Sequence, residues 1–131
     1  MKSYQIKIAE FVRDSEEIRV EDLSEDVLVG WFAHEMGHLV DYEPYNNLEM
    51  IKYGVKYMLS DPFKRKVEYA ADYIAITYGF KQEILASKHF ILNNELLDKA
   101  YKAKIRKYYL SIEDVELCSE DELILQPTSG I

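Results

Sequence analysis

The chain has 131 residues, 48% of them hydrophobic and 31% charged, a composition typical of one globular domain spanning residues 1–131. Its formal net charge of -8 argues against nucleic-acid binding driven by overall charge. The single cysteine, Cys118, excludes an internal disulfide, and we see neither a signal peptide nor an apolar run long enough to span a membrane, so we expect a cytoplasmic protein.

The N-terminal region is predicted to form a β-hairpin. Apolar and polar residues alternate in Tyr4–Ile8 and again around Ile18–Val20, the pattern of strands with one buried face. The polar segment 13–16 between them suits a turn, although Ile8, Phe11 and Val12 also fit a helical period. We therefore expect an α+β fold in which a small N-terminal hairpin or sheet packs on a helical bundle.

Helical periodicity and capping residues predict a series of helices after the hairpin. Ser24 is a suitable N-cap for the first, Pro44 ends it, and Asp61 followed by Pro62 is a typical helix start. The expected ranges are 25–43, 46–60, 62–78, 82–92 and 95–110, with a last helical turn at 111–116 and a frayed end at 126–131.

The first predicted helix carries the segment His34-Glu35-Met36-Gly37-His38. Residues four apart lie on the same helix face, so both imidazoles can bind one metal ion and Glu35 can reach a water molecule bound to it. Apolar residues surround this helix on nearly all sides, which indicates that protein encloses it. Buried imidazoles and carboxylates need partners, and a divalent cation can serve as that partner. This need favours a metal site over a helix with two incidental histidines.

A third metal ligand has several candidates in the sequence: Asp41, Glu68, His89 and Cys118. Asp41 lies on the same helix as both histidines and converges poorly with them, whereas His89 has no companion residue and Cys118 lies in an acidic tail. Glu68 shares a helix face with Asp72, and the alanines between them permit close helix packing. Asp72 can then accept a hydrogen bond from a metal-bound histidine, unless both acids pair with Arg65 or nearby lysines at the surface.

The segment His34–His38 followed by Glu68-Tyr69-Ala70-Ala71-Asp72 resembles the gluzincin clan of zinc metallopeptidases, especially its smallest members and the HtpX-type peptidases. The resemblance covers a core of about residues 16–80, whereas residues 81–131, with helices expected in 81–118, resemble no family that we can name. It implies that His34, His38 and Glu68 bind Zn2+, that Glu35 is the general base and that Asp72 supports a zinc-bound histidine. It also implies a small sheet beside the active-site helix.

The resemblance is incomplete. The transmembrane segments of HtpX-type enzymes are not present, and neither is the large C-terminal lobe of thermolysin-like enzymes that would supply an oxyanion-stabilising residue. Tyr42 and Tyr45 are among the eleven tyrosines that could take this role. We expect a zinc peptidase acting on a peptide or protein substrate, with a regulatory protease of the ImmA/IrrE type or a non-catalytic zinc-binding module as alternatives. Glu35 argues against the module, because a structural zinc does not need it.

The charge is unevenly distributed along the chain. Residues 1–49 carry a net charge of -8, residues 52–107 carry +6 and residues 108–131 carry -6. Acids and apolar side chains alternate in 112–125, so we expect this segment to pack on the basic helices. The alternative is that it lies along the active-site cleft, where an acid or the Cys118 thiolate blocks the zinc.

Overall fold

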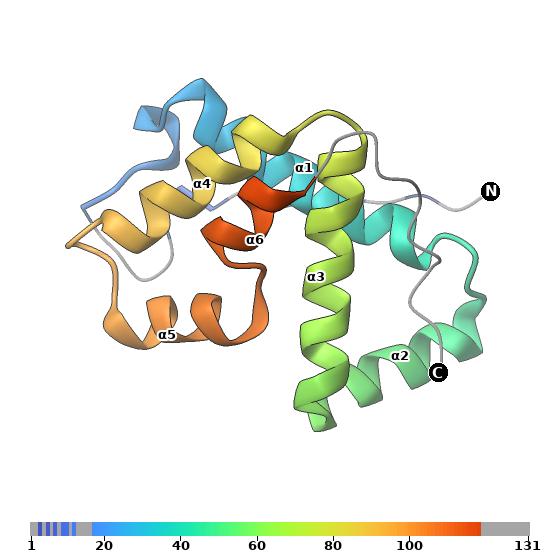
Figure 1. Cartoon of the computed structure of the whole chain (residues 1–131). Coiled ribbons are helices and arrows are strands. Elements are labelled where there is room, and N and C mark those ends of the chain that lie inside the picture. Colours follow the sequence, from blue (N-terminus) through green and yellow to red (C-terminus); the bar gives the residue numbers. More distant parts are fainter. Residues whose placement is uncertain are drawn as a thin grey trace.

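The computed structural model describes residues 3, 5, 7, 9, 10, 12 and 17–118. This part of the chain forms six α-helices and one short 3-10 helix (Figure 1). Their bounds are η1 Val20–Asp22, α1 Glu25–Tyr42, α2 Asn47–Leu59, α3 Asp61–Thr77, α4 Lys81–Asn93, α5 Lys99–Tyr108 and α6 Ile112–Leu117.

The predicted α+β fold is wrong, because the described residues contain no strand. Two backbone hydrogen bonds of a hairpin are present, from Val12 N–H to the Ile18 carbonyl at 2.8 Å and from Val20 N–H to the Glu10 carbonyl at 2.9 Å. The pairing stops there because η1 begins at Val20. Most of the first predicted strand, the predicted turn at 13–16 and the predicted frayed end lie outside the described residues.

The apolar residues assigned to a sheet pack on helices instead. Val12 and Ile18 are buried in one cluster with Ile91 of α4, Ile105 of α5 and Leu97 between these helices. The side chains of Ile91, Leu97 and Ile105 cover Val12 and Ile18, so no neighbouring strand is needed to bury these two residues. The helices of the C-terminal half therefore complete a core that the sequence pattern assigned to a sheet.

The predicted helices are present with small shifts that their caps explain. The Ser24 side chain caps α1 by accepting a hydrogen bond from Val27 N–H, as expected. At α3 the N-cap is Ser60 rather than the predicted Asp61, with Ser60 Oγ accepting from Phe63 N–H at 3.3 Å. α5 begins at Lys99 rather than near residue 95, because the Asp98 side chain caps it there.

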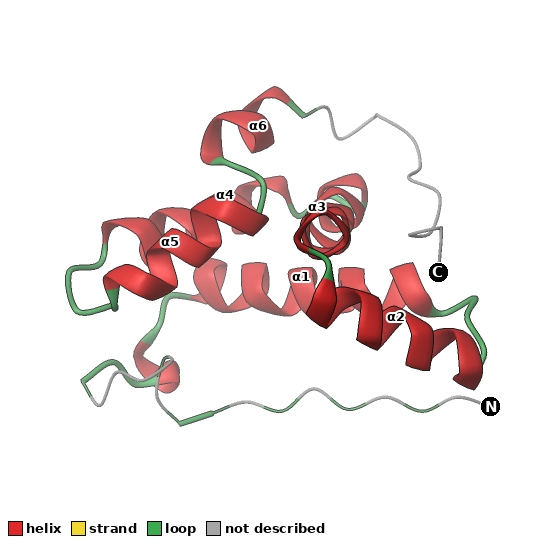
Figure 2. Cartoon of the chain, turned by 90° about the horizontal axis from the view of Figure 1, so that it is seen from below, coloured by secondary structure: helices red, strands yellow, loops and turns green. Residues whose placement is uncertain are grey.

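The central helix of the fold is α1, whose most extensive contacts are with α3 and α4. α3 crosses α1 and appears almost end-on in Figure 2. Two glycines allow these close crossings, since a Cβ atom on Gly30 would overlap the Glu83 carbonyl oxygen of α4, and one on Gly37 would overlap the Ala71 carbonyl oxygen of α3. Gly37 lies between the two motif histidines, so the close contact of α1 with α3 at Gly37 determines how near both histidines lie to α3.

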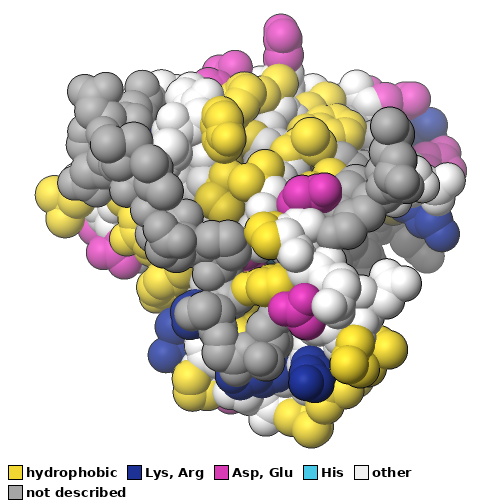
Figure 3. All heavy atoms as spheres, turned by 90° about the vertical axis from the view of Figure 1, so that its right-hand side faces the viewer, with side chains coloured by type: hydrophobic (Ala, Val, Ile, Leu, Met, Phe, Trp, Pro, Cys, Tyr) yellow, Lys and Arg dark blue, Asp and Glu magenta, His cyan; other side chains and the backbone are white. Residues whose placement is uncertain are grey.

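Several large hydrophobic side chains remain exposed on the outer face of α2. They are Leu48, Ile51, Val55, Met58 and Leu59. Figure 3 shows hydrophobic side chains at the surface on one side of the molecule, interspersed with charged groups. None of the helices in the described part has the length and apolar character needed to span a bilayer.

We expect Gly37→Ala to lower the free energy of unfolding by about 1–3 kcal/mol, because the added methyl group forces α1 away from α3. Denaturant titration with circular dichroism measures the change. Gly54→Ala is the matched control, because a Cβ atom there has no neighbour within 4 Å and alanine stabilises a helix relative to glycine. Equal destabilisation by the two substitutions would contradict the assigned role of the crossing.

Candidate metal centre

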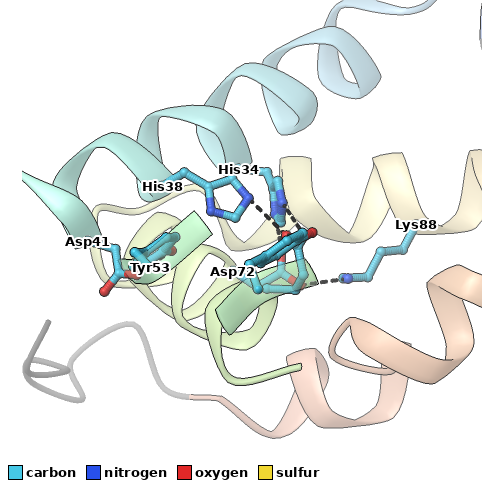
Figure 4. A network of polar contacts seen from close by, with 8 residues as sticks. His34, His38, Asp41, Tyr53, Asp72 and Lys88 are labelled. Carbon is cyan, nitrogen blue, oxygen red and sulfur yellow. Dashed lines mark hydrogen bonds and ion pairs between the residues drawn. The ribbon is translucent and has the colours of Figure 1, made fainter. Parts of the chain in front are cut away.

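His34 and His38 project from α1 toward α3 (Figure 4). Both imidazoles lie close to Glu68 of α3. The His34 Nε2 atom lies 3.2 Å from Glu68 Oε2, and the His38 Nε2 atom lies 3.3 Å from Glu68 Oε1. The Glu68 side chain is 3% exposed, whereas the two histidines are partly exposed. The structure thus brings together the three residues that the motif predicted as ligands.

The spacing of the three side chains fits a metal ion. In a tetrahedral zinc site with metal–ligand distances of about 2.0–2.1 Å, neighbouring ligand atoms lie about 3.3 Å apart. The two nitrogen–oxygen distances, each to a different Glu68 oxygen, are close to this value, and each residue offers one ligand atom within 4.8 Å of the other two. Two imidazole nitrogens and a carboxylate oxygen are a donor set typical of zinc, so the residues fit the ion that the sequence predicted.

Asp72 connects His34 to a lysine that the sequence analysis missed. Asp72 is 1% exposed, and its Oδ1 atom lies 2.8 Å from His34 Nδ1 while its Oδ2 atom accepts a hydrogen bond of 2.8 Å from Lys88 Nζ. With its Nδ1 proton held by Asp72, His34 presents Nε2 to the metal position. Lys88 is 5% exposed and lies on the buried face of α4 with Ile84 and Ile91. Its helical spacing from these two isoleucines was the sequence signal that could have identified it as a buried lysine.

The buried charges of the cluster stabilise one another. Burial by itself lowers the pKa of His34, but Asp72 and Glu68 outweigh this effect and raise the pKa to about 10. Burial by itself raises the pKa of Glu68, but its hydrogen bonds and charge interactions with both histidines hold that pKa far below its usual range. For Asp72 the opposing effect of Lys88 and His34 likewise outweighs burial and lowers the pKa.

Two tyrosines that sequence spacing could not select also contact the cluster. Tyr57 of α2 donates a hydrogen bond of 2.9 Å to Glu68 Oε1, and the Tyr109 ring stacks on His34 with the ring centroids 5.3 Å apart. Burial, followed by the charge of Glu68, raises the pKa of both hydroxyls, so both remain protonated donors near neutral pH. Of the tyrosines named from sequence, Tyr45 is buried beside Tyr53 and Phe63, whereas Tyr42 lines the pocket described next.

Glu35 is exposed and is not one of the residues held around Glu68. Together with His34 it borders a pocket of about 470 Å³ beside the metal cluster. The pocket is lined largely by aromatic and aliphatic side chains, among them Leu28, Trp31, Phe32, Leu39, Tyr42, Ile91, Tyr101, Ile105 and Tyr109. Glu35 therefore borders the same pocket as His34 and Asp72, whereas His38 and Glu68 do not line it.

The other candidate ligands lie apart from the cluster. Asp41 is buried and accepts a hydrogen bond of 3.2 Å from the Tyr53 hydroxyl (Figure 4), while His89 is exposed on α4. Cys118 and Val115 of α6 are buried in one cluster with residues of α1, α3 and α4, whereas Leu117 is exposed, so the start of the acidic segment packs on the helices only in part. The rest of that segment, from residue 119, lies outside the described residues. Among the described residues, the one group arranged to hold a metal is His34, His38 and Glu68.

Comparisons of the chain with protein-family models, curated proteins and solved structures give no match. The functional interpretation therefore depends on the motifs and on the geometry of the cluster.

Metal binding near neutral pH is expected to release at least one proton. The raised pKa of His34 means that this imidazole is a cation, protonated on both nitrogens, in the metal-free site, whereas a metal ligand must be neutral. Affinity should therefore rise about tenfold per pH unit for each proton released, up to about pH 10. Calorimetric titration with zinc in two buffers of different ionisation enthalpy counts the protons, and a value of zero would contradict the charge assignment.

Lys88→Met should strongly destabilise the protein, because it removes one partner of a buried ion pair and keeps the length of the side chain. Loss of one partner of such a pair costs about 3–5 kcal/mol, and thermal or denaturant unfolding of the metal-free protein measures it. Lys107→Met is the control, since the ion pair of Lys107 with Asp61 is exposed and its loss should change stability little. Similar melting temperatures for the Lys88 variant and the wild type would contradict this.

Proposed function

We propose that this chain is a zinc-dependent peptidase that hydrolyses peptide bonds in a peptide or protein substrate. The observation that carries the proposal is the convergence of His34, His38 and Glu68, each of which offers one ligand atom within 4.8 Å of the other two. Glu35 beside an open pocket adds the second feature that a hydrolase needs. The resemblance of the two motifs to those of gluzincin peptidases supports the same assignment.

Each residue has a defined part in the proposed reaction. His34, His38 and Glu68 bind the metal, and Asp72 orients His34 through Nδ1. Zinc, when bound, supplies a Lewis acid that lowers the pKa of a water molecule and polarises the scissile carbonyl. A Glu35 carboxylate oxygen takes a proton from the attacking water and delivers it to the leaving amine. The apolar pocket wall holds the substrate beside Glu35.

The proposal also covers where the protein works. The one cysteine is buried and forms no disulfide, which suits the reducing cytoplasm. We therefore propose a cytoplasmic peptidase.

The proposal is tested by Glu35→Gln in zinc-loaded protein, with a quenched-fluorescence peptide library as substrate. We expect one zinc per chain in both proteins by elemental analysis, and at least a 100-fold lower kcat for the variant because the proton shuttle is lost. Glu25→Gln is the control, because Glu25 is exposed on the first turn of the same helix. Equal rates for Glu35→Gln and the wild type, or a zinc-loaded wild type that cleaves no peptide, would overturn the peptidase assignment.

A further inference from the structure

The Glu68 carboxylate is contacted from three sides. His34 and His38 approach it from α1, Tyr57 donates to its Oε1 atom from α2, and the Tyr109 hydroxyl after α5 lies near enough that, besides burial, the Glu68 charge raises its pKa. His34 and Tyr57 are hydrogen-bonded to different oxygens of the carboxylate, so each oxygen has a partner. The two histidines bind a metal through the same Nε2 atoms that now face Glu68. The tyrosines are neutral donors and remain the groups that can hold the carboxylate when a metal is bound.

Tyr57 is the better placed of the two tyrosines to orient Glu68. Its hydrogen bond to Oε1 is 2.9 Å long, and its ring is contacted by Lys64 of α3, whose Nζ atom lies 5.3 Å from the ring centroid. The side chain is half-buried and is therefore restricted in its rotamers. Its hydroxyl is directed at one oxygen of Glu68, Oε1.

We propose that Tyr57 is a positioning residue for the metal site, holding the Glu68 carboxylate in the orientation in which it binds the ion. Its part resembles that of Asp72 toward His34, although it acts on the third ligand and from a different helix. This inference rests on the metal site of the proposed function and extends it to α2. A metal-bound carboxylate with no such partner can rotate, and loss of such a partner lowers metal affinity about 10–100-fold.

The same helix offers a matched comparison. Tyr53 lies one turn before Tyr57 on α2 and also donates its hydroxyl to a buried carboxylate, that of Asp41, at 3.2 Å. Asp41 does not belong to the metal cluster. Removal of either hydroxyl therefore costs one tyrosine–carboxylate hydrogen bond in the same region of the fold, but only the Tyr57 bond involves a proposed ligand.

The experiment compares Tyr57→Phe and Tyr53→Phe in the full chain. Zinc affinity is measured by competition with a chromophoric chelator, and the site geometry by the visible absorption spectrum of the Co2+-loaded protein. Tyr57→Phe should weaken zinc binding about tenfold or more and change the Co2+ spectrum, because only Glu68 loses a partner. Tyr53→Phe should leave both unchanged, while the melting temperatures of the two metal-free variants fall by similar amounts.

A double-mutant cycle tests whether Tyr57 acts through Glu68. In a Glu68→Ala background, Tyr57→Phe should cause no further loss of zinc affinity. Wild-type affinity in the Tyr57→Phe variant, equal losses in the two tyrosine variants, or full additivity in the cycle would each overturn the inference. A wild type that binds zinc but cleaves no peptide would overturn the peptidase alone, whereas a wild type that binds no zinc would overturn both proposals.

Discussion

The close crossing of α1 and α3 at Gly37 and Ala71 is the constraint on which the rest of the site depends. Gly37 has no side chain, so the α1 backbone lies directly against the Ala71 carbonyl. His34 and His38 flank this contact on α1, and Glu68 and Asp72 flank it on α3. At this separation a histidine and a carboxylate from opposite helices meet at hydrogen-bonding distance. A wider crossing would separate the ligands and remove the histidine partners of both buried carboxylates.

Burial makes the charges of the site depend on one another. Glu68 and Asp72 are almost completely buried, and their ionised forms persist because cationic or hydrogen-bonding groups reach each oxygen. Lys88 provides one of these groups from α4, and Tyr57 provides another from α2. The polar network therefore joins four helices, and packing errors in any of them would leave a buried charge unpaired. This coupling explains why elements without a recognisable motif still contribute to the site.

The proposed metal ligands and the proposed general base lie on different faces of α1. The face with His34, Gly37 and Asp41 lies against other protein, whereas Glu35 lies outside the ligand cluster and borders the pocket. Adjacent residues on a helix point about 100° apart, so one motif can place ligands on one face and a base on the next. The apolar pocket then brings a bound molecule to the border between these faces.

The sequence by itself determined the features that depend on short-range spacing. The cap at Ser24, the helical register of His34 and His38, and the shared face of Glu68 and Asp72 follow from local geometry. Only the tertiary structure decided that Ile18 packs on α4 and α5 rather than in a sheet, and that Lys88, Tyr57 and Tyr109 reach the cluster. Alternation over a few residues shows that one face is buried but not what covers it, because the covering side chains come from distant segments.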